Sequence, residues 1–285
     1  MKARSWENWL ENTFLGFLLL VVAVWVIFPI FWAAIGSLKS QLDSVASPPL
    51  FVPFLQYKVD PVGWIDVFSY QGRAIRAAAN SFIIAVSSAV LSVLIGSLAA
   101  YSLARFEFKR WKNDDIAFWI LSNRIFPAAV LVVPYFILFR TLNMLDTLPA
   151  VIIADTAANL PFVVWMLRGF FSELPKEIEE SAAVDGASPL SVFIRIVLPV
   201  SLPSIAVAWI FSFIFAWNEL LFGLALTLEK SQPLTVTMSG FLSQRGMDWW
   251  AISALSILSI GPPLVLSLAI QRYIVRGLTF GAVKG

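Results

Sequence analysis

The feature that most limits how this chain can fold is a series of six long apolar runs with almost no charge inside them. A helix of about 20 apolar residues is long enough to cross the hydrocarbon core of a bilayer. We therefore predict an all-α integral membrane protein with six transmembrane helices, over residues 14–34, 77–104, 116–139, 147–167, 196–228 and 249–271. Prolines interrupt several runs and predict bends that could line a cavity, at Pro29, Pro127, Pro134, Pro161, Pro262 and Pro263.

The composition agrees with a membrane protein that has one domain. Apolar residues make up 59% of the chain and charged residues 13%, against roughly 45 to 50% and about 25% in soluble domains. Six spans leave only short loops, so we predict a single transmembrane domain over residues 1–285 in contact with the lipid bilayer. The segment between the first two spans, residues 37–76, reads as an irregular outside loop with a short interfacial helix.

The chain contains no Cys and no His. It therefore lacks disulfides, thiolate or imidazole metal sites, a Cys nucleophile and the usual general base. We expect no catalytic residue and no metal site. Because the basic residues are dispersed along the loops, we expect no nucleic-acid partner either.

The distribution of Lys and Arg predicts the orientation. An even number of spans puts both termini on one side, and the first run is too long for a signal-peptide core. With the N-terminus inside, the cytoplasmic segments carry more Lys and Arg than the outside segments. We predict a multi-pass protein of the bacterial inner membrane with both termini in the cytoplasm.

A polar helix-turn-helix lies between the fourth and fifth spans, over residues 174–203. Its first helix is predicted from Lys176 to Val184 and closes at Gly186, where glycine can adopt a left-handed conformation. Ser188 and Pro189 then form a cap and a first helical residue. The second helix has one predicted apolar stripe, made of Leu190, Phe193, Ile194 and Val197.

This segment reads either as a docking surface or as a solvated amphipathic loop. Small side chains at Ser181, Ala182 and Ala183 would let a groove wall come close to the first helix. Glu179 and Glu180 would offer carboxylates to a basic partner.

Three charged residues lie within the predicted spans, namely Arg124, Asp155 and Glu219. A charge at membrane depth costs several kcal/mol unless it faces a partner or water. These residues are therefore candidates for a substrate pathway, or for a structural ion pair between Arg124 and a carboxylate. Side chains that could hydrogen-bond or stack on a substrate in the same regions are Asn123, Asn159, Trp165, Trp217 and Asn218.

The loop also fits a longer pattern: Glu180-Ser181-Ala182, then Gly186, then Ile196-Val197-Leu198-Pro199. This resembles the EAA motif of permease subunits in binding-protein-dependent ABC importers, with Ser181 in place of the first alanine. Two further stretches, Trp217-Asn218-Glu219 and residues 271–285, are similar to the carbohydrate-uptake branch and its maltose-type second permease. The resemblance covers roughly residues 76–285.

The resemblance implies a type I ABC importer transmembrane fold in which the loop at 172–199 carries a coupling helix. It implies as partners a second six-helix permease, two copies of a cytoplasmic ABC ATPase and an extracytoplasmic solute-binding protein. ATP and Mg would bind to the ATPase, since no Walker motif occurs here. The residues expected at the ATPase are Glu179, Glu180, Ser181, Ala182, Ala183, Asp185, Gly186 and Ala187.

The expected function is half of the pathway of an ATP-driven importer for a sugar or related polyol. One alternative is a secondary transporter driven by an ion gradient through Asp155 or Glu219, although no inverted repeat is visible. Another is a membrane enzyme acting on lipids. The basic tail at 276–285 could dock on the ATPase or lie at the lipid headgroups.

Overall fold

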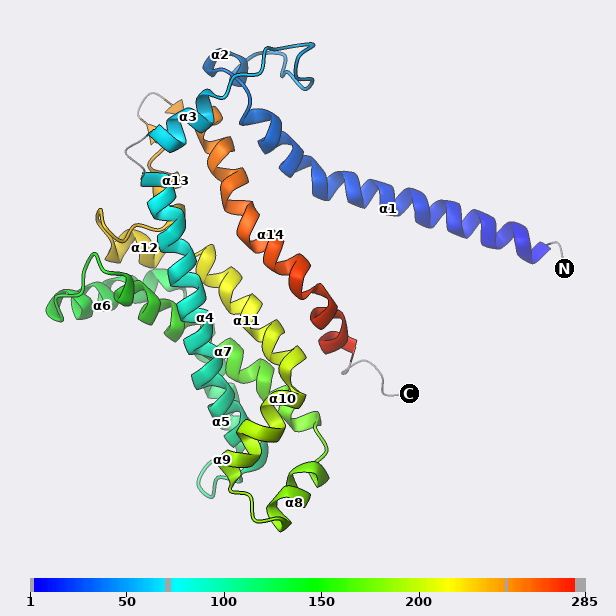
Figure 1. The fold of residues 1–285 in the computed structure, drawn as a ribbon, viewed down its shortest axis with the longest axis vertical. Helices are drawn as coiled ribbons and strands as arrows, with labels where there is room; N and C mark the ends of the chain where they lie inside the picture. The colour runs from blue at the N-terminus through cyan, green and yellow to red at the C-terminus, as the bar shows by residue number, and fades with distance from the viewer. Residues whose placement is uncertain (1–2, 70–72, 244–245, 280–285) are drawn as a thin grey trace. The chain divides into compact units, whose positions relative to one another are not determined.

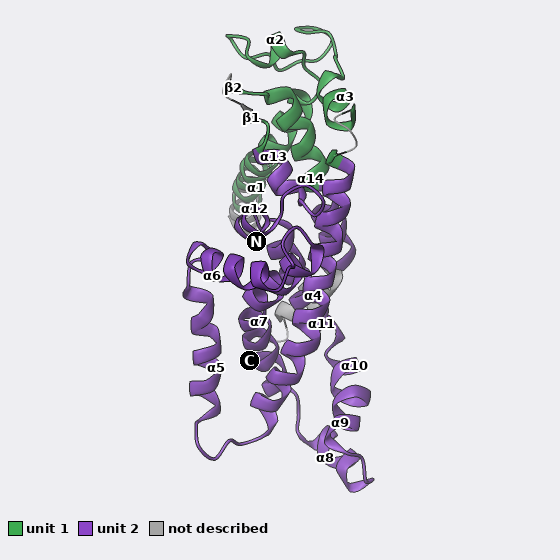
Figure 2. Cartoon of the chain, turned by 90° about the vertical axis from the view of Figure 1, so that its left-hand side faces the viewer, with its two compact units in different colours: residues 1–74, 240–260 green, residues 75–239, 261–285 purple. Residues whose placement is uncertain are grey.

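The computed structural model describes residues 3–69, 73–243 and 246–279. Within them the regular secondary structure is helical except for one short antiparallel pair of strands, β1 (Leu242–Ser243) and β2 (Gly246–Met247). The chain divides into two compact units, coloured separately in Figure 2. One unit comprises residues 1–74 and 240–260, and the other comprises residues 75–239 and 261–285.

The first unit contains α1 (Ala3–Gly36), α2 (Gln41–Ser44), α3 (Val62–Ser69), both strands and the start of α14 (Trp249–Thr279). The central part of α1 is apolar on all sides, and none of its most apolar window is buried. Such a helix requires a lipid environment. One short helix was predicted in the irregular segment after the first span, and the structure has two there, α2 and α3.

The end of α1 and the short helix α3 both pack closely on α14 within this unit. A Cβ built on Gly36 would lie 2.6 Å from Oγ of Ser253, so only glycine fits there without a shift. The indole Nε1 of Trp250 donates a 2.8 Å hydrogen bond to Oδ2 of Asp66. These contacts fix the end of α1 and the helix α3 to the start of α14.

The second unit is an assembly of helices arranged around α7, as Figure 1 shows. Its long helices are α4 (Arg73–Arg105), whose first two residues belong to the first unit, and α7 (Leu148–Glu173). Its medium helices are α5 (Asn113–Ser122), α6 (Ala128–Thr141) and α11 (Leu202–Trp217). The short ones are η1 (Asn123–Ile125), α8 (Glu177–Val184), α9 (Pro189–Val192), η2 (Phe193–Val197), α10 (Leu198–Val200), α12 (Leu221–Leu226) and α13 (Leu234–Ser239).

The central helix α7 is the most buried of the four long apolar helices. It packs closely on α4, where a Cβ on Gly96 would lie 2.7 Å from Cγ1 of Val163. On α11 it packs through aromatic contacts of Phe162 with Phe211 and Phe215. Both neighbours are thereby held to one central helix.

Among the described residues, four helices are long and apolar enough to cross a membrane, and the number is six if each of two bent helix pairs is counted as one span. The prediction of an all-α membrane fold with six spans is therefore confirmed, but two of the spans are bent helix pairs. The third span, however, is not straight. It is bent by 88° between Asn113–Ile125 and Ala128–Thr141, so that α6 lies nearly at a right angle to α5 in Figure 2. Pro127 lies at this bend, where the preceding residue is biased toward an extended conformation.

The fifth predicted span, residues 196–228, is wrong as a single helix. The chain bends by 81° between Pro189–Val200 and Leu202–Trp217, and Ser201 lies at the bend. Pro199 and Pro203 flank this point and lack the backbone donors that would continue the ladder. A second break, at residues 218–220, separates α11 from α12.

The predicted basic tail at 276–285 is only partly described. Helix α14 continues through Thr279, so the start of this tail is helical. Residues 280–285 lie outside the described part of the chain.

Candidate functional site

The polar loop between α7 and α11 begins with α8, which ends in a regular C-terminal cap. Gly186 has φ +84°. Its amide donates to the carbonyl of Ala183, and the amide of Ala187 donates to the carbonyl of Ala182, both at 3.0 Å. This pair of bonds is the Schellman motif, in which glycine avoids the cost of a left-handed backbone. The predicted end of the first loop helix at Gly186 is confirmed.

The second helix begins as predicted but its apolar face differs. Ser188 accepts a 3.3 Å hydrogen bond from the amide of Ser191, and Pro189 is the first helical residue. The turn that follows is the π-helix η2, which adds a residue per turn and rotates the face. Leu190 and Ile194 are consequently exposed, and the predicted stripe is wrong for them. The buried face consists of Val192, Phe193 and Val197, which join the core formed by α4, α7 and α11.

Adjacent glutamates on α8 have different surroundings. Oε1 of Glu179 accepts a 2.7 Å hydrogen bond from Nε of Arg105, and Oε2 accepts one of 2.8 Å from the hydroxyl of Tyr101. Glu179 thus binds α8 to α4 rather than pointing to solvent. Glu180 is exposed, as are Ser181, Ala183, Asp185 and Gly186, whereas Ala182 and Ala187 are half-buried.

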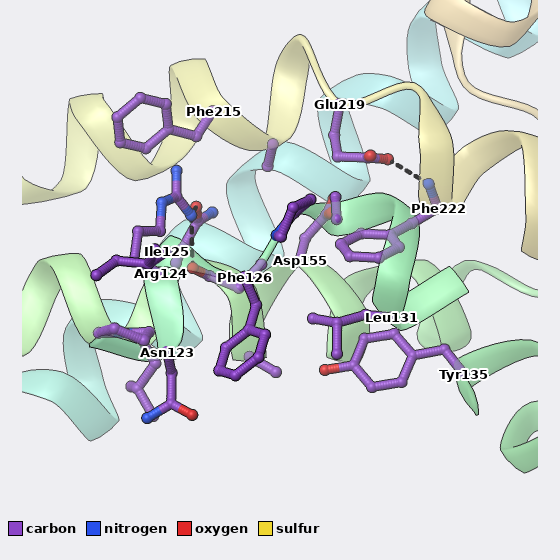
Figure 3. Close-up of a pocket in the computed structure, with 18 of the residues that line it drawn as sticks. Asn123, Arg124, Ile125, Phe126, Leu131, Tyr135, Asp155, Phe215, Glu219 and Phe222 are labelled. Atoms are coloured by element: carbon purple, nitrogen blue, oxygen red, sulfur yellow. Dashed lines mark hydrogen bonds between the residues drawn. The ribbon is translucent and has the colours of Figure 1, made fainter. Parts of the chain in front are cut away.

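A second feature of this unit is a cavity of about 680 Å³. It lies between α5, α6, α7 and the end of α11, and Figure 3 shows the side chains around it. Five of the seven pathway candidates from the sequence line it, namely Asn123, Arg124, Asp155, Asn159 and Glu219. Bends in the third and fifth spans bring these residues together.

Arg124 is held by hydrogen bonds to uncharged groups on α7. Its Nη1 donates to the carbonyl of Ala158 at 2.5 Å and to Oδ1 of Asn159 at 3.3 Å. Its guanidinium lies 4.7 Å from the ring centre of Phe215. The expected ion pair between Arg124 and a carboxylate does not occur among the described residues.

Glu219 acts as a cap for the short helix α12. Its Oε1 accepts from the amide of Leu221 at 2.8 Å, and its Oε2 accepts from Phe222 at 2.9 Å and Gly223 at 3.2 Å. A carboxylate at a helix N-terminus satisfies amides that otherwise have no partner. This explains why the chain breaks after α11 and restarts immediately.

Asp155 has no such partners. Its side chain is 2% exposed, and within the described structure neither carboxyl oxygen forms a hydrogen bond. One turn further along α7, Asn159 is hydrogen-bonded, because its amide nitrogen donates to the carbonyl of Ser212 at 3.1 Å.

The two remaining pathway candidates do not line the cavity. Trp217 is buried in a stack with Phe213, with ring centres 5.6 Å apart. The amide of Asn218 donates to the carbonyl of Ile214, and its side chain is exposed. Trp165, which the sequence also indicated, is exposed and away from the cavity.

Sequence reasoning missed the aromatic residues that line the cavity, which are Trp119, Phe126, Tyr135, Phe215 and Phe222. Phe215 precedes Glu219 by four positions, and this spacing places two helical residues on one face. That signal was available in the sequence. Trp119, Phe126 and Tyr135 lie on either side of the bend at Pro127, and Phe222 follows the break at residues 218–220, so none of them carries a comparable signal.

Comparison with known proteins identifies the family. Residues 92–280 match the family of binding-protein-dependent transport system inner membrane components. The chain belongs to this family. It is the membrane-spanning permease of an ABC importer, and the family predicted from the resemblance is thereby confirmed. The permease is a transport component and a multi-pass protein of the inner membrane.

Two curated relatives cover nearly the whole permease. A probable ABC transporter permease, y4oR of Sinorhizobium fredii, is 34% identical and spans 93% of this chain and 92% of its own length. The trehalose/maltose transport system permease MalG of Thermococcus litoralis is 32% identical and spans 93% and 94%. The comparisons give no support to an ion-gradient transporter.

The fold is also that of a solved ABC importer. A bacterial ABC transporter that imports the acidic polysaccharide alginate matches 93% of this permease and 96% of its own chain. The TM-score is 0.75 and the sequence identity is 21%. The predicted ABC importer transmembrane fold is confirmed.

Proposed function

We propose that this permease imports a sugar or related polyol and couples to an ATPase through the loop at 172–199. The relative MalG is named for trehalose and maltose transport, and the solved neighbour for alginate import, so both handle carbohydrates. The complete assembly would contain a second permease, two ATPase subunits and an extracytoplasmic binding protein. ATP and Mg would bind to the ATPase subunits. The chain would act as one permease domain with both termini in the cytoplasm.

The observation that carries the coupling role is that two adjacent glutamates of α8 have different surroundings. Glu179 anchors this helix to α4 through Arg105 and Tyr101, while Glu180 projects to solvent from the same turn. An anchored helix with a free carboxylate and small neighbouring side chains suits docking into a basic groove. ATP-driven closure of the ATPase dimer would then move α8 and α4 together as a rigid body.

Affinity purification of the permease from its native membrane in mild detergent tests this proposal. An ATPase should co-purify with the unaltered chain and be lost with Glu180→Lys. Glu177→Lys is the matched control, because Glu177 is also exposed on α8 but lies outside the motif. Equal recovery of the ATPase with both variants would exclude Glu180 as a docking contact. Absence of any ATPase from a complex shown to survive the detergent would exclude the coupling role.

A further inference from the structure

The cavity contains a buried carboxyl group whose hydrogen-bonding capacity is unused. Asp155 lies on α7 with 2% of its surface exposed, and neither of its oxygens has a partner within the described residues. Of the carboxyl groups in that part of the chain, Asp155 alone has both oxygens buried and unpartnered. Leaving a buried acceptor unsatisfied costs about 1–3 kcal/mol. Such a group calls for a ligand or another function.

The neighbouring polar groups form their hydrogen bonds elsewhere. Arg124 donates to Ala158 and Asn159, and Asn159 donates onward to Ser212. Glu219 accepts three amides of α12. Within the described residues none of these side chains bonds to Asp155, whose carboxyl oxygens stay unpartnered.

The cavity has the size and lining of a small-molecule site. Its volume of about 680 Å³ lies within the range of about 300–1,000 Å³ typical of ligand pockets. Trp119 and Phe126 line it and are 69% and 60% exposed, so both retain ring surface for a ligand. Aromatic faces of this kind can cover the apolar C–H face of a pyranose ring.

We propose that this cavity is a saccharide subsite in which Asp155 accepts hydrogen bonds from hydroxyl groups of a neutral sugar. The inference rests on the proposed sugar transport and deepens it, because it makes this permease a direct substrate contact. Hydroxyl donors match the two free oxygens of Asp155, and Trp119 and Phe126 match the apolar face of the ring.

A metal ion is a poorer occupant of the same site. Hard cations need several oxygen ligands. In the described part of the chain no group of three or more acidic residues could hold a metal, and the oxygens of Glu219 already accept from α12. A neutral polyhydroxylated ligand needs only acceptors and an apolar face.

The absence of native cysteine allows a direct test in the assembled transporter. Asn123 is exposed at the cavity and Ser172 is exposed at the end of α7 outside it, so Asn123→Cys and Ser172→Cys provide a reporter and a matched control. Maleimide labelling of each would be followed while trehalose or maltose is added. Either sugar should slow labelling at 123 and leave 172 unchanged.

Adding Asp155→Ala to the reporter should raise the protecting concentration about tenfold or more, as expected for one lost buried hydrogen bond. The melting temperature separates this from misfolding. Because Asp155 has no partner to lose, Asp155→Ala should keep or raise it. The proposal is overturned if neither sugar protects, or if the Asp155→Ala reporter is protected at the same sugar concentration as the parent. ATPase co-purification is read separately, so failure of the subsite and failure of the coupling role are distinguishable.

Discussion

Nε of Arg105 and Oε1 of Glu179 lie 2.7 Å apart, although the two residues are 74 positions apart in the sequence. The ion pair is shielded, with side-chain exposures of 8% and 13%. Arg105 also donates to the carbonyl of Leu174, and Tyr101, one turn earlier on α4, donates to the other oxygen of Glu179. The loop helix α8 is thus fixed to a transmembrane helix by directional bonds as well as by apolar packing.

Removing this pair should weaken both stability and coupling. Glu179→Ala leaves the shielded guanidinium of Arg105 without its carboxylate, which costs about 3 kcal/mol in a buried pair. We expect a lower melting temperature for the purified permease and less substrate transported per ATP hydrolysed. Thermal unfolding and paired transport and ATPase assays measure these effects.

The ion pair between Arg168 and Asp114 provides the control for that experiment. The Asp114 side chain is 86% exposed, so this pair contributes at most about 1 kcal/mol. Asp114→Ala should therefore have a small effect on both readouts. An effect of Glu179→Ala no larger than that of Asp114→Ala would contradict the role assigned to the Arg105–Glu179 pair.

The sequence predicted the loop well where local chemistry decides the structure. Gly186 and the Ser188-Pro189 pair act within a few residues of themselves, and both predicted boundaries are confirmed. Glu179 was predicted to contact the ATPase, but in the structure it contacts Arg105. This contact depends on how α4 and α8 meet. No spacing within the loop reveals that contact.

The apolar runs likewise predicted where the spans lie but not where they break. The apolar run continues across Pro127, and in the sequence only this proline marks the bend of 88°. Glu219 was read as a charge at membrane depth, and it is the cap that restarts α12 after a break. The cavity exists because of these breaks, so its aromatic lining could not be read from straight helices.

The effect of a substitution at Gly186 should depend on whether the new residue adopts a left-handed backbone, and not on the size of its side chain. A Cβ at this position would meet nothing within 4 Å, yet φ is +84°. Valine strains a left-handed backbone by about 1–2 kcal/mol, whereas asparagine adopts it readily. Gly186→Val should lower coupled transport and Gly186→Asn should largely retain it. Equal activity of the two variants in a transport assay would show that the cap geometry does not matter.

The close contact of α4 with α7 predicts a steric effect at Gly96. A Cβ there would lie 2.7 Å from Cγ1 of Val163, and overpacking of this kind costs about 1–3 kcal/mol. Gly96→Ala should lower the melting temperature, and the added change Val163→Ala should recover part of the loss. Gly169→Ala, which meets nothing within 4 Å on α7, should instead be neutral or stabilising. Destabilisation by Gly169→Ala equal to that by Gly96→Ala would rule out the steric explanation.

The turn between α6 and α7 holds a carboxylate in a ring of backbone amides. Oδ1 of Asp146 accepts from the amides of Leu228, Glu229, Lys230 and Ser231 at 3.0 to 3.2 Å. Burial raises the pKa of the Asp146 carboxyl, but these four donors outweigh it and lower the pKa to about 2. The loop after α12 is thereby fastened to the start of α7.

This contact should make stability depend on pH in the acidic range. The pKa of Asp146 is about 2 in the folded protein and 3.8 for the unperturbed group, so its stabilisation is complete above about pH 4 and is lost as the pH falls toward 2. Asp146→Asn removes the charge but keeps one acceptor oxygen, and should cost about 1–2 kcal/mol at neutral pH. Melting temperatures of the parent and the variant, measured from neutral pH downward, should therefore converge below about pH 4. A difference that stays constant to the lowest pH would mean that the charge of Asp146 does not stabilise the turn.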